Sequence, residues 1–264
     1  MTDALPLSGR AALVTGAAGG IGFATAVALA DAGADVALND LALSPRLEDL
    51  ERRIQSRGRR TRTFPVDVAD QPAVESMVVD VASHFGRLDV LVISAVYSDR
   101  EPFISADMAG FRRTIDVSMW GAFYVLRATA KAMIRQGQGG AVVMVSSPHA
   151  HVAFPNCMAY NMAKAAQDQM ARSASIELNR HRIRVNVVHP GWTDTPGERK
   201  YYSEEVLRSA GPTLPAGRLA RPEEIARAIL FLVDPASEYI NGITLTVDGG
   251  LSLPWWSKRG EGSL

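Results

Sequence analysis

The sequence predicts a single α/β domain built on one doubly wound parallel sheet, with helices on both faces. Short apolar runs of strand length alternate along the 264 residues with longer segments of helical periodicity, as in parallel sheets connected through helices. The first apolar run, Ala11–Val14, leads directly into a glycine-rich turn and then into a helical pattern. No repeat or composition shift divides the chain, so residues 1–264 form one predicted domain.

Each predicted element follows from a local pattern. Strands are expected where short apolar, often β-branched runs stand between turn residues. The expected strands are residues 11–14, 35–40, 62–68, 88–93, 141–145, 183–191 and 243–247. The expected helices are residues 24–32, 72–85, 108–135, one that includes Tyr160, and 222–233. Gly33 ends the first of these helices, and a glycine-rich break at 136–140 ends the third.

The turn after the first strand has the pattern of a phosphate cradle. Gly16, Gly20 and Gly22 allow a tight turn and a close approach of the backbone to a pyrophosphate. The N-terminus of the following helix supplies free N–H groups and a positive dipole. Asp40 ends the next strand about 20 residues later, where a carboxylate binds the adenosine ribose hydroxyls. Because this carboxylate repels a 2′-phosphate and Leu41 supplies no cation, Asp40 favours NAD over NADP.

A second set of reactive groups stands in residues 146–164. Ser147 follows an apolar run, and Tyr160 and Lys164 are four residues apart, so a helix presents both on one face. Lowering the pKa of a tyrosine by about 3 units requires roughly 4 kcal/mol, which a close, partly desolvated cation can supply. We therefore predict that Lys164 lowers the pKa of Tyr160. The phenol then exchanges a proton with an alcohol or carbonyl oxygen that Ser147 holds.

Charge and composition argue against several other functions. Basic and acidic residues number 28 each, so no electrostatic case exists for binding nucleic acid or an anionic membrane. No apolar run has the length of a membrane span, and the N-terminus lacks the pattern of a signal peptide. The single cysteine, Cys157, excludes an intrachain disulfide and fits a reducing compartment. We expect a cytoplasmic protein that binds a small molecule and has no metal site.

These motifs resemble the short-chain dehydrogenase/reductase family over nearly the whole chain. The matching segments are Thr15–Gly22, Ser147, Tyr160 with Lys164, Arg184–Asn186, Pro190–Gly191 and Val247–Gly250. The resemblance implies a Rossmann fold that binds NAD across the strand ends and transfers a hydride between NAD and a secondary alcohol or carbonyl. It implies cofactor contacts at Gly16, Ala18, Gly20, Ile21, Gly22, Asp40, Asp67, Val68, Ala95, Tyr160, Lys164, Pro190, Gly191, Thr193 and Thr195.

The resemblance also implies an assembly and a role for each catalytic residue. Tyr160 acts as acid or base, Lys164 bonds the nicotinamide ribose, and Ser147 orients the reacting oxygen. Members of the family are usually homotetramers built by the long helices and the last strand. We expect Trp255 and Trp256 to be buried against a neighbouring subunit.

Two positions depart from the family pattern. The family carries Asn-Asn-Ala-Gly after its fourth strand, whereas this chain has Ile93-Ser94-Ala95-Val96. We expect the branched Val96 to change the backbone angles or the approach of the cofactor. The family's active-site asparagine, thought to hold a water that links the lysine to solvent, is Ser118 here. A serine has one donor and a shorter reach, so we keep Ser118 in the catalytic set and expect proton supply to be slower or rearranged.

The predicted substrate region combines polar side chains with aromatic rings, which suits a sugar or polyol. Residues 192–217 have no regular period, and so long a connection is usually functional, so we predict a lid there. The candidate substrate residues are Ser147, His149, His151, Asn156, Tyr160, Trp192, Tyr201 and Tyr202. The C-terminal segment and residues 146–149 resemble the glucose 1-dehydrogenase-like members of the family.

Three functions remain open on the sequence. The first is an NAD-dependent sugar or polyol dehydrogenase. The second is a reductase of a 3-oxoacyl thioester or another ketone. The third, from a different class, is a cofactor-binding regulator with impaired catalysis, which Val96 and Ser118 suggest. The presence of Ser147, Tyr160 and Lys164 together argues against this third function.

Overall fold

The chain forms one seven-stranded parallel sheet within residues 5–253, the part that the computed structural model describes. The strands are β1 (Ala11–Thr15), β2 (Asp35–Asp40), β3 (Thr61–Pro65), β4 (Val90–Ile93), β5 (Gly140–Val145), β6 (Ile183–Pro190) and β7 (Thr244–Val247). Their order in the sheet is β3-β2-β1-β4-β5-β6-β7. The chain therefore reverses direction across the sheet between β1 and β4, the kind of position where such folds bind ligands. The predicted doubly wound sheet is confirmed.

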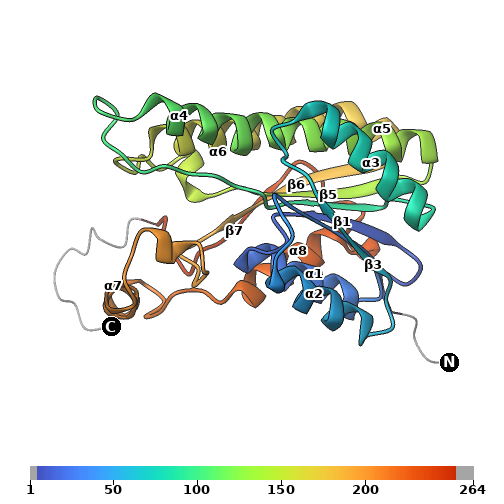
Figure 1. The fold of residues 1–264 in the computed structure, drawn as a ribbon, viewed down its shortest axis with the longest axis horizontal. Coiled ribbons are helices and arrows are strands. Elements are labelled where there is room, and N and C mark those ends of the chain that lie inside the picture. The colour runs from blue at the N-terminus through green and yellow to red at the C-terminus, as the bar shows by residue number, and fades with distance from the viewer. Residues whose placement is uncertain (1–4, 254–264) are drawn as a thin grey trace.

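Helices cover both faces of the sheet (Figure 1). They are α1 (Gly20–Asp31), α2 (Pro45–Gln55), α3 (Gln71–Phe85), α4 (Met108–Ile115), α5 (Ala122–Gln136), α6 (Met158–Leu178), α7 (Glu204–Ala210) and α8 (Pro222–Val233). In Figure 1, α3, α4, α5 and α6 lie above the sheet, and α1, α2 and α8 lie below it. Each face encloses its own apolar core, because the strands are apolar on both sides.

Local signals explain where the helices begin and end. The side chains of Ser44 and Asp70 cap the N-termini of α2 and α3. Gly86 and Gly137 end α3 and α5 in the left-handed conformation that glycine adopts without strain. No range is predicted for α2 from the sequence, although Leu47, Leu50 and Ile54 recur at the spacing of an amphipathic helix among charged residues.

The long helix expected at 108–135 is wrong in detail. The segment consists of α4, a π-helical turn at Asp116–Gly121, and α5. A π-helical turn inserts an extra residue into the regular hydrogen-bond ladder and is often found at functional sites. Ser118 lies inside this turn and is fully buried. Hydrophobic periodicity cannot detect the turn, since the chain remains helical on both sides of it.

The segment 192–217 is more ordered than its sequence suggests. It contains a 3₁₀ turn at Glu198–Lys200, the short helix α7 and a second 3₁₀ turn at Gly211–Thr213. Ser203 caps α7 by accepting a hydrogen bond from the N–H of Val206. Helix α7 has seven residues, too few for a clear period.

Candidate active site

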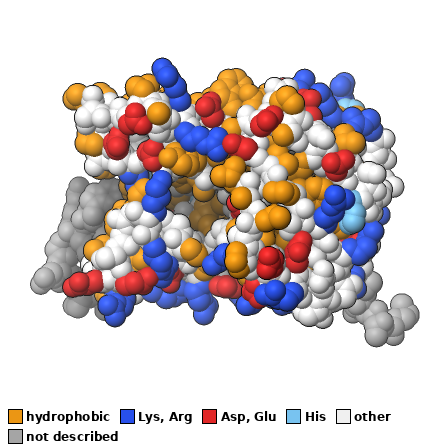
Figure 2. Space-filling model, viewed as in Figure 1, with side chains coloured by type: hydrophobic (Ala, Val, Ile, Leu, Met, Phe, Trp, Pro, Cys, Tyr) orange, Lys and Arg blue, Asp and Glu red, His pale blue; other side chains and the backbone are white. Residues whose placement is uncertain are grey.

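A large cavity opens at the carboxyl ends of the central strands. Its volume is about 1150 Å³, and residues from the glycine turn, the ends of β2, β4, β5 and β6, and the segment 192–202 line it. Figure 2 shows the opening as a hollow with apolar side chains around it. With the exception of Gly22, every residue predicted to contact the cofactor lines this cavity. The contacts themselves stay predictions.

The glycine turn has no room for side chains. Gly16 has a φ of +66°, and a Cβ there would lie 2.8 Å from the Cα of Ala95. A Cβ on Gly20 would lie 2.6 Å from the Thr195 Cγ2 atom, across the cavity entrance. Gly22 lies beneath the turn, where a Cβ would come within 2.2 Å of the carbonyl oxygen of Gly16. The backbone therefore requires glycine at Gly16 and Gly22, and a side chain at Gly20 would have to displace the side chain of Thr195.

The start of α1 is open to an anion. Its N-cap residue, Gly19, provides no side-chain cap for the first N–H groups of the helix. These groups and the helix dipole are suited to a pyrophosphate. Ala18 and Ile21 line the cavity beside them. The residues of the turn therefore fit the phosphates of a dinucleotide.

Asp40 faces the same turn from the end of β2. Its carboxylate accepts hydrogen bonds from the N–H groups of Ala18 and Leu41, each at 2.8 Å. A second carboxylate on the cavity wall, that of Asp67, forms an ion pair of 2.9 Å with Arg113. Asp40 therefore presents a fixed negative charge next to the phosphate cradle.

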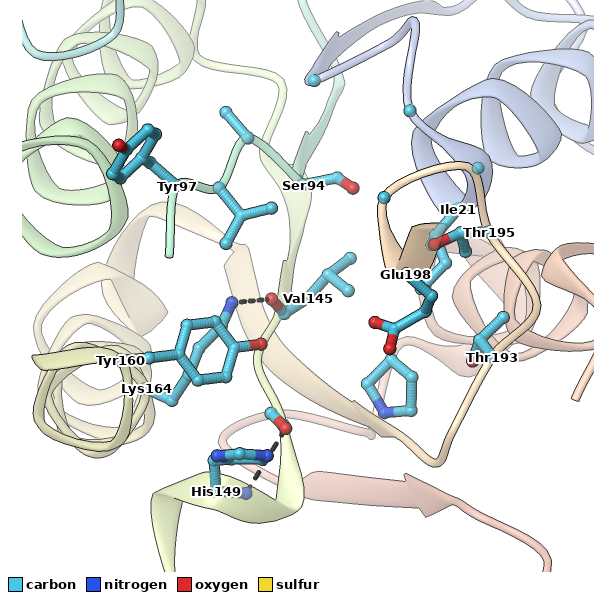
Figure 3. A pocket seen from close by; sticks show the side chains of 18 of the residues that line it. Ile21, Ser94, Tyr97, Val145, His149, Tyr160, Lys164, Thr193, Thr195 and Glu198 are labelled. Atoms are coloured by element: carbon cyan, nitrogen blue, oxygen red, sulfur yellow. Dashed lines mark hydrogen bonds between the residues drawn. The ribbon is translucent and has the colours of Figure 1, made fainter. Parts of the chain in front are cut away.

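The three predicted reactive groups line the opposite wall, and Figure 3 shows Tyr160 and Lys164 there. Ser147 follows β5, while Tyr160 and Lys164 lie one turn apart on α6. The Lys164 Nζ atom lies 5.4 Å from the centroid of the Tyr160 ring and donates a hydrogen bond of 2.7 Å to the carbonyl oxygen of Val145. Tyr160 and Lys164 therefore lie close together, and their catalytic roles stay predictions.

The predicted lowering of the Tyr160 pKa is wrong for the protein without cofactor. Burial raises the pKa of Tyr160 to about 12, against the opposing effects of a hydrogen bond with Ser147 and the charge of Arg100. Burial also lowers the pKa of Lys164 to about 7, against the opposing charge of Asp168. The reason is desolvation, which disfavours the charged form of each group and is the largest effect on both pKa values.

Comparison with known proteins identifies the family. Residues 16–252 match the family model described as enoyl-(acyl carrier protein) reductase. The cis-4-hydroxycyclohexanecarboxylate dehydrogenase of Sinomonas cyclohexanicum is 38% identical over 242 residues, 91% of this chain and 96% of that protein. The L-rhamnose 1-dehydrogenase (NAD(P)(+)) of Sphingomonas sp. (strain SKA58) is 35% identical and covers 93% of this chain and 97% of its own length.

Structural comparison agrees with the sequence comparison. A short-chain type dehydrogenase/reductase from Mycobacterium marinum superimposes with a TM-score of 0.90 at 31% identity, covering 96% of this chain and 99% of that one. The chain belongs to the short-chain dehydrogenase/reductase family. The comparisons support an oxidoreductase that acts on CH–OH groups and uses a nicotinamide cofactor.

The first departure from the family pattern, Val96, causes no backbone strain. Within residues 5–253, only Asn156 and Arg182 among the non-glycine residues have a positive φ. Val96 lines the cavity and is half exposed. Val96 therefore does not adopt the left-handed conformation, and its effect on the approach of the cofactor stays a prediction.

The second departure, Ser118, lies behind the cavity wall. Its hydroxyl donates a hydrogen bond of 2.7 Å to the carbonyl oxygen of Tyr97 and accepts one of 3.0 Å from the N–H of the same residue. Ser118 therefore fixes the loop that follows β4. Its backbone carbonyl oxygen, in contrast, faces α6 and accepts a hydrogen bond from the side chain of Gln167.

His149 is held rigidly beside Tyr160. Its ring stacks on Phe154 with centroids 3.9 Å apart and meets the Tyr160 ring edge-on at 5.0 Å. The His149 Nδ1 atom lies 2.6 Å from the Oδ1 atom of Asn161, whose amide nitrogen donates to the carbonyl oxygen of Phe154. Burial lowers the pKa of His149 to about 4, so the ring is neutral at pH 7.

His151 takes no part in the cavity that described residues line. Its exposed ring stacks on His189, with centroids 5.3 Å apart. The prediction that His151 contacts substrate is therefore not supported by its position. Asn156, Trp192, Tyr201 and Tyr202 do line the cavity.

Arg100 and Glu198 are cavity residues that the sequence analysis missed. The guanidinium of Arg100 lies 3.9 Å from the centroid of the Tyr201 ring and donates a hydrogen bond of 3.1 Å to the hydroxyl of Tyr202. Glu198 lies 3.7 Å from Arg100 and accepts a hydrogen bond from the indole N–H of Trp192. In Figure 3, the carboxylate of Glu198 points across the cavity toward Tyr160.

Within residues 5–253, every helix is too short or too polar to cross a bilayer.

Proposed function

We propose that the protein is an NAD-dependent dehydrogenase of a sugar or polyol, with Tyr160 as the catalytic acid or base. The observation that carries the substrate class is the wall around Tyr160, where His149 and Glu198 stand among aromatic rings. Hydroxyl groups need hydrogen-bond partners, and the C–H faces of a sugar stack on aromatic rings. We further propose that segment 192–217 acts as the lid over this substrate.

The hydrogen bonds of His149 define what this residue can recognise. The side-chain nitrogen of Asn161 donates a hydrogen bond to the carbonyl oxygen of Phe154, so the side-chain oxygen of Asn161 faces His149 Nδ1. Nδ1 of the neutral ring therefore carries the proton, which leaves Nε2 as an acceptor. An acceptor of this kind suits a substrate hydroxyl and not a second carbonyl oxygen.

The chain's own groups account for the proton transfer. In alcohol oxidation, Tyr160 as phenolate takes the hydroxyl proton, and Ser147 orients the reacting oxygen. Because burial raises the pKa of Tyr160 to about 12, this direction depends on the positive charge of Lys164 lowering that pKa in the complex with cofactor and substrate. Bound NAD supplies the hydride acceptor, and we propose that the glycine turn and Asp40 hold it. Carbonyl reduction is the same path in reverse, with Tyr160 as the acid. The high pKa of Tyr160 keeps the free protein in the protonated form that reduction needs.

A cyclic hydroxy acid is a second candidate substrate. Arg100 places a guanidinium in the cavity, and guanidinium groups bind carboxylates in a bidentate manner. The relative from Sinomonas cyclohexanicum is named for such a substrate. Arg100 already lies near Glu198, which favours the polyol, because binding of a carboxylate would have to compete with this residue.

The test is a substrate panel of sugars, polyols, cyclic hydroxy acids and 3-oxoacyl thioesters, each with NAD and NADP. We expect NAD-dependent oxidation of a sugar or polyol, with Tyr160→Phe protein as the blank for contaminating activity. Turnover of hydroxy acids alone, or of thioesters alone, would refute the polyol proposal. Cofactor binding with no turnover of any substrate would instead favour the regulator.

We also propose that the protein is a homotetramer, which light scattering tests by measuring its mass in solution. We further propose that it works in a reducing compartment. Apolar side chains on the π-helical turn and α6 are exposed, with Trp120 at 44%, Met162 at 51% and Ile176 at 79%. Such a surface is suited to a subunit contact. Trp255 and Trp256, which the sequence analysis assigns to this contact, lie outside the described residues. Cys157 is buried, and its burial raises the pKa of the thiol, consistent with a structural role.

A further inference from the structure

Lys164 is enclosed on the side away from the cavity. Only 3% of its surface is exposed, although its Nζ atom carries three donors. One donor bonds the carbonyl oxygen of Val145 on β5 at 2.7 Å, and a second bonds the Oε1 atom of Gln167 at 3.2 Å. A buried ammonium requires such acceptors, because an unpaired charge away from water is costly.

Gln167 stands three residues after Lys164 on α6 and is 1% exposed. Its side-chain nitrogen donates a hydrogen bond to the carbonyl oxygen of Ser118, in the π-helical turn. A carbonyl oxygen accepts only, so the amide nitrogen must face Ser118 and the amide oxygen must face Lys164. The chemistry of the two neighbours therefore fixes the orientation of the amide.

The position of this amide has a functional meaning. It joins the ammonium of Lys164 directly to residue 118, the position where the family resemblance implies an asparagine that holds a water between the lysine and solvent. An amide does not titrate, so it holds the lysine in place without passing on a proton. We propose that Gln167 is the positioning residue of Lys164, holding its ammonium behind Tyr160 by bridging it to the Ser118 carbonyl. This inference rests on the proposed function only for the expected change in the pH profile of kcat/KM.

The other titratable groups described near Lys164 are not substituted in the test variants. Asp168 follows on the same helix and favours the charged lysine. Asp168 is itself bonded to His189 of β6 at 2.9 Å. Tyr160 and His149 are the titratable neighbours on the cavity side. None of these groups contacts the Gln167 amide through a hydrogen bond that the structure shows within residues 5–253.

The first measurement needs no cofactor or substrate. Lysine labelled with ¹³C at the ε position reports the titration of Lys164 by NMR, starting from a pKa of about 7. Gln167→Met removes the acceptor at nearly constant volume, and we expect the titration midpoint to fall by about one pH unit or more. Gln167→Glu keeps an acceptor and adds a negative charge, so the midpoint should rise. Gln169→Met, the same change at an exposed position of α6, should leave it unaltered.

The second measurement is the pH profile of kcat/KM for alcohol oxidation. With less positive charge behind Tyr160, the Gln167→Met profile should rise only at higher pH, with activity at pH 7 reduced about tenfold. The Gln167→Glu profile should move in the opposite direction. Opposite displacements distinguish positioning of a charge from loss of packing, which would lower stability in both variants without this pattern.

The outcomes separate the two proposals. The inference would be overturned if the Lys164 titration midpoint were equal in the Gln167→Met and Gln169→Met proteins. It would also be overturned if this midpoint moved in the same direction in the two Gln167 variants. If Gln167→Met does not fold, an unmoved midpoint in Gln167→Glu overturns it equally. Predicted NMR shifts in a protein that turns over no alcohol would support the inference about Gln167 and refute the proposed function.

Discussion

The two sides of the cavity are built by different means. On the side of β1 and β2, the backbone forms the wall: Gly16 and Gly22 pack against main-chain atoms, and Asp40 accepts hydrogen bonds from main-chain N–H groups. On the side of β5 and the segment 192–202, side chains form the wall. There Tyr201 donates to the carbonyl oxygen of Ser98, and Arg100 lies between Tyr201 and Tyr202.

This difference has a consequence for specificity. A wall of backbone fits the invariant part of a ligand, since it can change only through the fold. A wall of side chains changes with single substitutions and decides which substrate fits. A substitution on the cofactor side is therefore expected to disturb cofactor binding and the local fold together. A substitution on the substrate side is expected to change only the contacts of that one residue.

The largest effect is expected where the two sides meet, at Tyr160. Tyr160→Phe removes the proton donor and keeps the ring, so turnover should fall by about 10² to 10⁴-fold or more. Cofactor affinity, measured by nucleotide fluorescence titration, should remain within about twofold. A fully active variant would refute the mechanism, and a parallel loss of cofactor binding would show that the two sides are not separable.

The next largest effect is expected at Gly16, on the backbone wall. Gly16→Ala combines a left-handed residue with a Cβ 2.8 Å from the Ala95 Cα atom, so the turn must shift and cofactor affinity should fall at least about tenfold. Gly58→Ala is the matched control, because Gly58 has a φ of +70° with no atom within 4 Å. It should lose about 1–2 kcal/mol of stability at most and leave cofactor affinity unchanged. Equal affinities in the two variants would contradict the proposed cradle.

The same difference explains how much the sequence predicts. The glycine turn, Asp40 and the pair Tyr160 and Lys164 depend on short spacings, and the doubly wound sheet follows from the alternation of strand and helix patterns. These features were predicted because each is encoded within a few neighbouring residues.

Features made by distant residues were not predicted. Arg100 approaches Tyr201 and Tyr202 only after two loops, far apart in sequence, fold over the same cavity. Gln167 lies within a helix whose pattern predicts an apolar stripe, and its polar partner, Ser118, comes from a π-helical turn. The pKa of Tyr160 was predicted with the wrong sign, because the sequence does not show how completely the pair is removed from water.

A smaller effect is expected from the charge of Asp40. Asp40→Ala should reduce the preference for NAD over NADP by about tenfold, because a charged hydrogen bond to a ribose hydroxyl and a repulsion of the 2′-phosphate both disappear. Asp40→Asn keeps an acceptor for the N–H of Ala18 but removes the charge. If charge sets the preference, both variants should shift the ratio of kcat/KM values for the two cofactors. An unchanged ratio in both would refute the cofactor argument.

The smallest effect is expected from a single contact of the side-chain wall. Tyr201→Phe removes the hydrogen bond to the Ser98 carbonyl oxygen and keeps the ring beneath the Arg100 guanidinium. A neutral hydrogen bond contributes about 0.5–1.5 kcal/mol, so the substrate KM should rise roughly 2- to 10-fold with cofactor affinity unchanged. Tyr239→Phe, at a fully exposed tyrosine, is the control and should change neither constant. An equal change in cofactor affinity would mean that segment 192–202 serves both sides of the cavity, and the division between a backbone wall and a side-chain wall would then fail at this position.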